Sequence, residues 1–323
     1  DEVAERYDLS PALLRTHEDG FTRISYRDLR ARSIATAARL QAAGLKAGER
    51  VLLSGANHPD WVIGYFGILR AGGVAVPVDP GLEPAAVANI VRASGATAAL
   101  LDDAATERFE LEEDIYTLAE VTLPGAKTAL VAPTIENDTL ASILYTSGTT
   151  GQPKGVMLTH GNFCALLASV GRLFSLNAED RLLSVLPLHH AFEFACGLLL
   201  PLSMGARIIY LDQVDGDRLA YGLQKGRVTC MVGVPALWQL LERRIRGQVS
   251  TKGQVFNLAF DAGLELNRIV GKQTGLDLGK LMFGSVHDRL GGNIRLLISG
   301  GAALPQGTHT LFQGLGLHLS EGY

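Results

Sequence analysis

A glycine- and hydroxyl-rich segment with one lysine gives the clearest chemical signal in the chain. Residues 145–155 are YTSGTTGQPKG and directly follow an apolar run. Glycines let the backbone turn its N–H groups toward an anion, and hydroxyl groups donate further hydrogen bonds. Lys154 adds a positive charge next to the rigid Pro153. We therefore expect this segment to bind a polyphosphate.

The spacing of this segment differs from that of other common phosphate-binding loops. In a Walker A loop the lysine directly follows a glycine and precedes Ser or Thr. Here Gln152 and Pro153 separate Gly151 from Lys154, and Gly155 follows the lysine. The sequence contains no GxGxxG and no GxSxG motif, which removes the usual signals for dinucleotide binding and for a hydrolase nucleophile. A flexible linker is the alternative, but a linker needs no Pro-Lys-Gly after a buried strand.

Two adjacent histidines form a second candidate site. His189 and His190 follow Pro187 and Leu188 in a predicted turn from strand to helix. They could bind a metal ion, cap a helix at the surface, or line a substrate entrance. The sequence shows no accompanying cluster of metal ligands, which disfavours the metal site.

Short apolar, often β-branched runs alternate with longer helical stretches, and these elements must position both candidate sites. Strands are expected at residues 51–53, 74–76, 98–101, 142–145, 155–159, 182–186, 207–210, 229–232 and 295–298. Helices are expected at residues 26–43, 59–71, 83–93, 161–173, 191–203, 217–225 and 235–246, while residues 250–292 stay ambiguous. Such alternation predicts right-handed crossovers and parallel sheets.

The alternation weakens over residues 102–138, where acidic residues and prolines dilute the apolar signal. We therefore expect an α/β protein built of two packed αβ sub-domains with mostly parallel sheets. The first would cover residues 1–135, and the second, residues 136–323, would hold the phosphate loop.

Composition excludes several classes of protein. The 323 residues are 47% hydrophobic, which excludes a disordered chain, and the net charge of −4 gives no sign of nucleic-acid binding. Three widely spaced cysteines, Cys164, Cys196 and Cys230, match neither a disulfide framework nor a zinc site, so we expect buried, reduced thiols. The first residues do not resemble a signal peptide, and charges or proline interrupt every long apolar stretch. These features favour a cytoplasmic protein without a transmembrane segment.

Taken together, the motifs resemble those of the acyl-adenylate-forming (AMP-binding) superfamily, which includes acyl-CoA synthetases, luciferases and peptide-synthetase adenylation domains. Residues 145–155 look like its phosphate-binding signature, and residues 187–190 resemble its PLxH element. Residues 299–305 resemble its adenine-pocket turn, and residues 321–323 the opening of a later motif. The matches occur in the family's order and cover most of the chain.

The resemblance implies a two-step reaction in which ATP activates a carboxylate to acyl-AMP and a thiol, commonly that of coenzyme A, then displaces AMP. It implies that Lys154 and His190 take part in catalysis, with His190 lining the carboxylate entrance, and that Thr146 helps to hold Mg²⁺. The residues that it implies for binding the nucleotide are Thr146, Ser147, Gly148, Thr149, Thr150, Gly151, Lys154, Gly300, Gly301, Ala302, Glu321, Gly322 and Tyr323.

The segments at residues 187–194 and 280–305 look closest to long-chain fatty acid–CoA ligases. The expected partners are therefore ATP, a fatty acid and coenzyme A, without nucleic acid, and peripheral membrane contact is conceivable. Alternatives are an aryl acid, an amino acid, a carrier-protein-linked fatty acid, an NTPase or kinase, or a non-catalytic nucleotide-binding protein. The resemblance also implies that a third sub-domain and a C-terminal lid domain lie outside this chain. We therefore expect this polypeptide alone to bind ATP weakly and to have negligible ligase activity.

Overall fold

The computed structural model describes residues 1–111, 114–126, 129–146 and 154–322. The chain divides into two compact units, each described here by itself. The first unit contains Asp1–Ala178 and Pro187–Tyr210, and the second contains Glu179–Leu186 and Leu211–Tyr323. The division expected near residue 135 therefore falls inside the first unit. The physical reason is strand pairing, because the strand that follows residue 135 joins the sheet formed by the strands before it.

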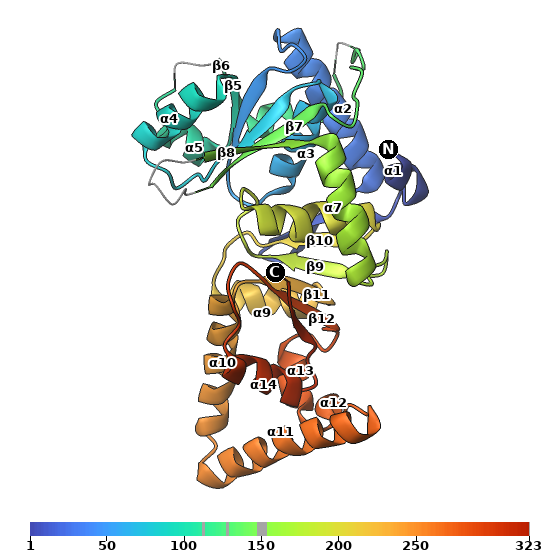
Figure 1. The fold of residues 1–323 in the computed structure, drawn as a ribbon, viewed down its shortest axis with the longest axis vertical. Coiled ribbons are helices and arrows are strands. Elements are labelled where there is room, and N and C mark those ends of the chain that lie inside the picture. Colours follow the sequence, from blue (N-terminus) through green and yellow to red (C-terminus); the bar gives the residue numbers. More distant parts are fainter. Residues whose placement is uncertain (112–113, 127–128, 147–153, 323) are drawn as a thin grey trace. The chain divides into compact units, whose positions relative to one another are not determined.

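A six-stranded sheet forms the centre of the first unit (Figure 1), with the strand order β6-β5-β3-β4-β7-β8. The strands are parallel except for β8, which is antiparallel to β7. Their bounds are β3 Arg50–Ser54, β4 Val74–Pro77, β5 Ala96–Leu101, β6 Asp114–Thr117, β7 Leu140–Thr146 and β8 Lys154–Thr159. The central strands are buried along most of their length, as expected for a parallel sheet covered on both faces.

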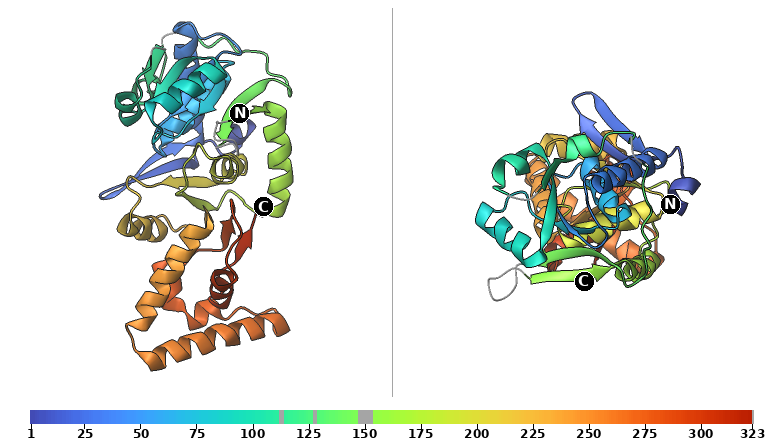
Figure 2. Two further views of the ribbon diagram at one scale, coloured as in Figure 1. Left: turned by 60° about the vertical axis from the view of Figure 1, so that its left-hand side comes forward. Right: turned by 90° about the horizontal axis from the view of Figure 1, so that it is seen from above.

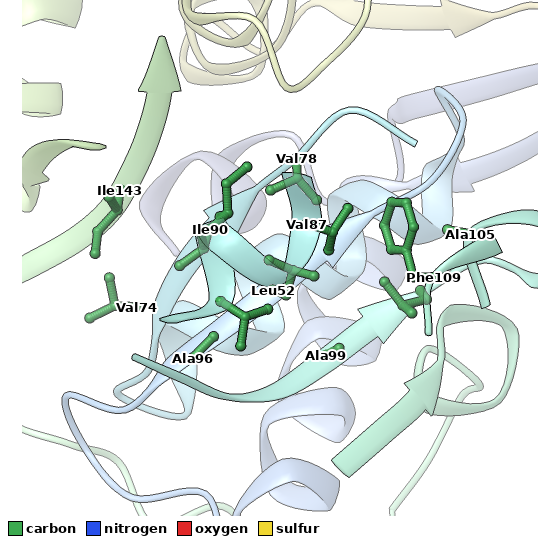
Figure 3. Close-up of a cluster of buried hydrophobic side chains, with 13 residues drawn as sticks. Leu52, Val74, Val78, Val87, Ile90, Ala96, Ala99, Ala105, Phe109 and Ile143 are labelled. Carbon is green, nitrogen blue, oxygen red and sulfur yellow. The ribbon is translucent and has the colours of Figure 1, made fainter. Parts of the chain in front are cut away.

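The helices of this sheet bury apolar side chains against it. Figure 3 shows Val87 and Ile90 of helix α4 packed with Leu52 and Val78, next to Phe109. The helices of this part of the chain are α1 Glu2–Arg6, α2 Tyr26–Ala42, α3 Pro59–Arg70, α4 Pro84–Ser94, α5 Asp103–Arg108 and α6 Leu118–Val121. Gly95 ends α4 in the left-handed conformation with φ of 64°, as expected of a glycine that follows a helix.

The first unit also contains three further strands, in the order β10-β1-β2, and the helices that follow the β7–β8 hairpin. Their bounds are β1 Pro11–His17, β2 Gly20–Ser25, α7 His160–Leu173, η1 Glu193–Leu199, α8 Leu200–Ser203 and β10 Arg207–Tyr210. The helix expected at residues 191–203 is therefore a π-helix, η1, that continues as one α-helical turn. Apolar periodicity does not distinguish these two helix types.

The second unit holds four parallel strands in the order β13-β12-β11-β9, with six helices around them in the described part of the chain. The strands are β9 Arg181–Ser184, β11 Cys230–Gly233, β12 Leu296–Ser299 and β13 Leu319–Glu321. The helices are α9 Gly216–Lys225, α10 Pro235–Ser250, α11 Gln254–Thr274, α12 Gly279–Met282, α13 Gly284–Arg289 and α14 Gln306–Gly314. The predicted α/β fold with mostly parallel sheets is confirmed.

The cysteines differ in part from expectation. All three are free thiols, but only Cys230 is buried, and Cys164 is exposed on α7. This helix buries a single side chain, Phe163, which leaves Cys164 at the surface. Within the described ranges, every helix is too short or too polar to span a lipid bilayer.

Candidate active site

The predicted phosphate loop lies in the sequence between β7 and β8, two antiparallel strands that are drawn in green (Figure 2). Thr146 and Lys154 are the last antiparallel partners of these strands. Both are exposed and form the pair next to the loop, so the hydroxyl group and the ammonium group stand at the loop end of the hairpin. The residues between them, including the predicted Ser147, Gly148, Thr149, Thr150 and Gly151, lie outside the described residues.

The hairpin stem explains part of the motif beyond its phosphate-binding residues. Gly155 pairs with Tyr145, and an added Cβ atom at Gly155 would lie 2.8 Å from Ile143 Cγ2 and 3.1 Å from Tyr145 Cζ. A side chain at this position would therefore displace the tyrosine ring that lies across the strand. Beneath it, Ser142 is fully buried and hydrogen-bonds Tyr65, with 3.0 Å between their oxygen atoms. A hydrogen-bonded stem with a buried β7 strand thus carries the loop, which is not a feature of a flexible linker.

The histidine pair lies in the turn before η1, and a hydrogen bond within the first unit holds this turn. The Leu188 N–H donates to Asn57 Oδ1 at 3.0 Å, and the Leu188 side chain is buried. The His189 Nε2 atom lies 3.9 Å from Asp79 Oδ2. The ring of His190 lies 4.3 Å from that of His189, between centroids, and His190 is exposed.

The two histidines therefore differ in environment. His189 is only 11% exposed at its side chain. Burial, followed by the nearby His190, lowers the pKa of His189 to about 4, and Asp79 opposes this shift. His189 is consequently neutral at pH 7, while His190 faces solvent. Among the described residues, no group of three or more His, Cys, Asp or Glu side chains could hold a metal ion, which leaves the metal-pair hypothesis without support.

The sheet topology places the hairpin and the histidine turn at one edge. Asn57 follows β3, Asp79 follows β4, and Thr146 ends β7, and these three strands are parallel neighbours. The carboxyl ends of parallel strands are where ligands bind in α/β sheets. Asn57 and Asp79 are not among the residues predicted from the sequence. Each is a polar residue shortly after a buried strand, but the residues that they contact, Leu188 and His189, are far from them in the sequence.

In the second unit, the turn after β12 and the end of β13 come together. The Leu304 N–H donates to Glu321 Oε1 at 2.7 Å, and the Gly322 N–H donates to the Ser299 carbonyl oxygen at 2.8 Å. The structure thus brings the predicted residues Gly300, Gly301 and Ala302 next to the predicted Glu321 and Gly322. Tyr323 lies outside the described residues.

The turn leaves open space beside its backbone at Gly301. Gly301 has φ of 78°, and an added Cβ atom there would meet only Val234 Cγ1, at 3.6 Å. Gly300 is held by a hydrogen bond from its N–H to the Gly233 carbonyl oxygen at 3.0 Å. Ser299 Oγ is buried and has no hydrogen-bond partner among the described residues. The exposed backbone of Gly301 and Ala302 is therefore the part of this turn that a ligand could reach.

Three comparisons with known proteins agree with these features. The family model described as "AMP-binding enzyme" matches residues 1–323. The chain is 29% identical over 320 residues to fatty acyl-CoA synthetase A of Dictyostelium discoideum, which covers 87% of this chain and 46% of that protein. It is 30% identical over 224 residues to a feruloyl-CoA synthase of an Amycolatopsis species, which covers 69% of this chain and 46% of that protein. The chain thus spans less than half the length of both relatives.

The fold is also similar to that of a solved structure. The N-terminal domain of FACL13 from Mycobacterium tuberculosis, solved with an inhibitor, superposes with a TM-score of 0.76 at 23% sequence identity. The match covers 100% of this chain and 73% of that one. At this identity the similarity supports the fold alone.

Proposed function

Because the chain belongs to the AMP-binding enzyme family, we propose that the whole protein uses ATP to activate a carboxylic acid and then forms a thioester. The observation that carries this proposal is the hairpin that pairs Thr146 with Lys154 at the carboxyl edge of a parallel sheet. The turn at residues 299–305 supports it, because the exposed glycine backbone at Gly301 would let an adenine base approach closely.

In the first step, a carboxylate oxygen of the acid would attack the α-phosphorus of ATP, and the bond to the bridging oxygen would break to release pyrophosphate. In the second step, the sulfur of a thiol would attack the acyl carbonyl carbon, and AMP would leave with the electron pair of the C–O bond. Such phosphoryl chemistry depends mainly on positioning and on neutralisation of charge.

The residues of the first unit would handle the phosphates and the acid. Lys154 would neutralise charge on the phosphates held by Ser147–Gly151, since no ion pair within the described residues occupies its ammonium group. His190, exposed beside the anchored His189, would line the carboxylate entrance. Neutral His189 would keep a second positive charge away from this entrance.

The residues of the second unit would hold the base. Gly300, Gly301 and Ala302 would line one face of the adenine, and Tyr323 would stack on the base, with Glu321 and Gly322 supporting the turn. Thr146 would contribute its hydroxyl oxygen to a Mg²⁺ ion bound with the nucleotide. The exposed hydroxyl fits this role, since Mg²⁺ prefers oxygen ligands and usually enters such sites through substrate phosphates. When bound, Mg²⁺ supplies charge neutralisation at the phosphates.

For the substrates, we propose a long-chain fatty acid and coenzyme A, with the protein acting as an acid–thiol ligase in the cytoplasm. The similarity to a fatty acyl-CoA synthetase supports the fatty acid. The similarity to a feruloyl-CoA synthase favours an aromatic acid as the second candidate.

ATP–pyrophosphate exchange with the whole protein tests the proposal. We expect exchange only when a carboxylic acid is added, with fatty acids of graded length compared against ferulate to identify the acid. Exchange in the absence of any acid, or release of ADP in place of AMP, would contradict acid activation.

A further inference from the structure

A cavity of about 690 Å³ opens among the helices of the second unit. The residues that line it come from α9, α10, α11, α12 and α13 and from the turns between them, and none lies on a strand. None belongs to the predicted nucleotide-binding residues either. Its volume lies within the range of roughly 300–1,000 Å³ that small-molecule sites occupy. The cavity is therefore a candidate for a second binding site.

The walls of this cavity are largely apolar and well packed. Leu223 of α9, Leu241 of α10 and Phe260 of α11 line it, and all three are buried. The rings of Phe260 and Phe283 contact each other edge to face, with 5.2 Å between their centroids. An added Cβ atom at Gly263 would lie 3.1 Å from Phe283 Cζ, so this glycine lets α11 approach the ring closely. These packed side chains form an apolar surface, called the apolar wall below, that suits a hydrocarbon chain.

Positive charges surround the apolar wall. Arg244, Lys252 and Arg289 line the cavity, whereas Asp217 is the single acidic residue among its lining residues. In the described part of the chain, the guanidinium groups of Arg244 and Arg289 have neither an ion-pair partner nor a hydrogen-bond acceptor. By contrast, Arg246, which does not line the cavity, pairs with both Glu242 and Asp261.

The combination of an apolar wall and unpaired cations defines the chemistry of the ligand. Arg244 and Arg289 are exposed, so water can hydrate their guanidinium groups, but a carboxylate adds charge-assisted hydrogen bonds that an uncharged lipid does not supply. A small inorganic anion would leave the apolar wall exposed to water. A molecule with one carboxylate and a hydrocarbon chain satisfies both, since charge-assisted hydrogen bonds from arginine to carboxylate are among the stronger ones.

We propose that this cavity binds a fatty acid, with the carboxylate on Arg244 and Arg289 and the chain against the apolar wall. This second site is independent of acid activation. It would let the protein hold a fatty acid outside the site at the hairpin and the histidine turn.

Photolabelling tests the proposal. The probe is dodecanoic acid that carries a diazirine on its chain, and the labelled peptides of the protein are identified by mass spectrometry. We expect labels on α10, α11 or α13. The double variant Arg244→Glu and Arg289→Glu should weaken binding at least about tenfold, which is the order expected for loss of a charged hydrogen bond. Arg243→Glu is the matched control, because Arg243 is the neighbouring exposed residue of α10 and does not line the cavity. It should change binding by less than about twofold.

Three results would overturn the proposal. One is labelling that maps only outside these helices, and another is labelling that the double variant leaves unchanged. The third is competition by dodecanol as strong as that by dodecanoate, because this would exclude recognition of the carboxylate. His190→Ala separates the two sites, since it should leave the label in the cavity even if acid activation is lost. Thermal unfolding of each variant shows whether it has folded, and Arg244→Gln with Arg289→Gln provides a milder substitution.

Discussion

Thr146 and Lys154 face each other across β7 and β8 as the last pair of the hairpin. The pairing of the two strands therefore fixes the distance between these two residues. The β7 side of this stem is buried through Ala141, Ser142, Ile143 and Leu144. The ammonium group of Lys154 is thus carried by a rigid element although the side chain itself is exposed.

Lys154→Ala should lower the rate of acyl-adenylate formation by about 10²–10³-fold, the loss typical of removing one preorganised charge or donor. Because the side chain is exposed, the thermal unfolding midpoint should stay unchanged. ATP–pyrophosphate exchange measures the rate, and Lys225→Ala, at an exposed lysine of α9, is the control. Equal rates in the two variants would remove Lys154 from the site.

The buried His189 should make stability depend on pH. Its pKa is lowered to about 4 in the folded state, below the ordinary value of 6.5. The unfolded chain therefore binds more protons between these values, and folding stability falls as pH decreases through this window. The loss should be on the order of 1–3 kcal/mol.

His189→Gln removes this titration. The difference in unfolding free energy between pH 7 and pH 4.5, measured by urea denaturation, should shrink by that amount. His17→Gln, at an exposed histidine of β1, should leave the difference unchanged. A pH dependence that is the same in His189→Gln and in the unsubstituted protein would show that His189 is not held neutral by its surroundings.

Asn57 should act as a positioning residue for the histidine turn. Asn57→Ala removes the acceptor for the Leu188 N–H, at a cost of about 1–3 kcal/mol if that group stays unpaired. We expect the KM for the carboxylic acid to rise several-fold, with a smaller change in the KM for ATP. Asn57→Asp keeps an oxygen acceptor and should restore much of the affinity. Failure of this rescue, together with equal losses for both substrates, would indicate a general loss of structure.

Gly155 should be required for packing of the hairpin stem. Gly155→Ala places a methyl group against Ile143 and Tyr145, and overpacking of this kind costs about 1–3 kcal/mol. The thermal unfolding midpoint should fall. Gly20→Ala is the control, because its methyl group would meet only His17, at 3.4 Å. If both variants unfold at the same temperature, a methyl group at Gly155 fits in the stem without displacing Ile143 or Tyr145, and the prediction is wrong.

Sequence patterns predicted the parts of the fold that depend on local order. The strand expected at 155–159 agrees with β8, and the helix expected at 59–71 agrees with α3 to within one residue. The apolar stripe of α2, with Leu29, Ala37 and Leu40, is buried as its spacing indicates.

Residues 250–292 stayed ambiguous for a physical reason. Val255 and Leu258 of α11 are 82% and 72% exposed, so apolar residues lie on its outer face as well as on its buried one. The 3.6-residue period is weakened when both faces are apolar.

Long-range pairing could not be predicted from local patterns. The parallel contact of β7 with β4 joins segments on either side of residues 102–138, a pairing that the local sequence pattern does not indicate. The contacts of Asn57 with Leu188 and of Asp79 with His189 depend on the same sheet. In the candidate site, the sequence motifs predicted the residues that would bind the substrates, whereas the contacts that hold those motifs in place emerged only from the tertiary structure.

The hydrogen bond from Leu304 to Glu321 couples two segments that the motifs treat separately. If β13 shifted along β12, the Glu321 carboxylate would move the backbone of the turn at Leu304. The hydrogen bond from the Gly322 N–H to the Ser299 carbonyl oxygen would transmit the same movement. The shape of the proposed adenine-binding surface therefore depends on the position of β13, and it can respond to whatever moves that strand.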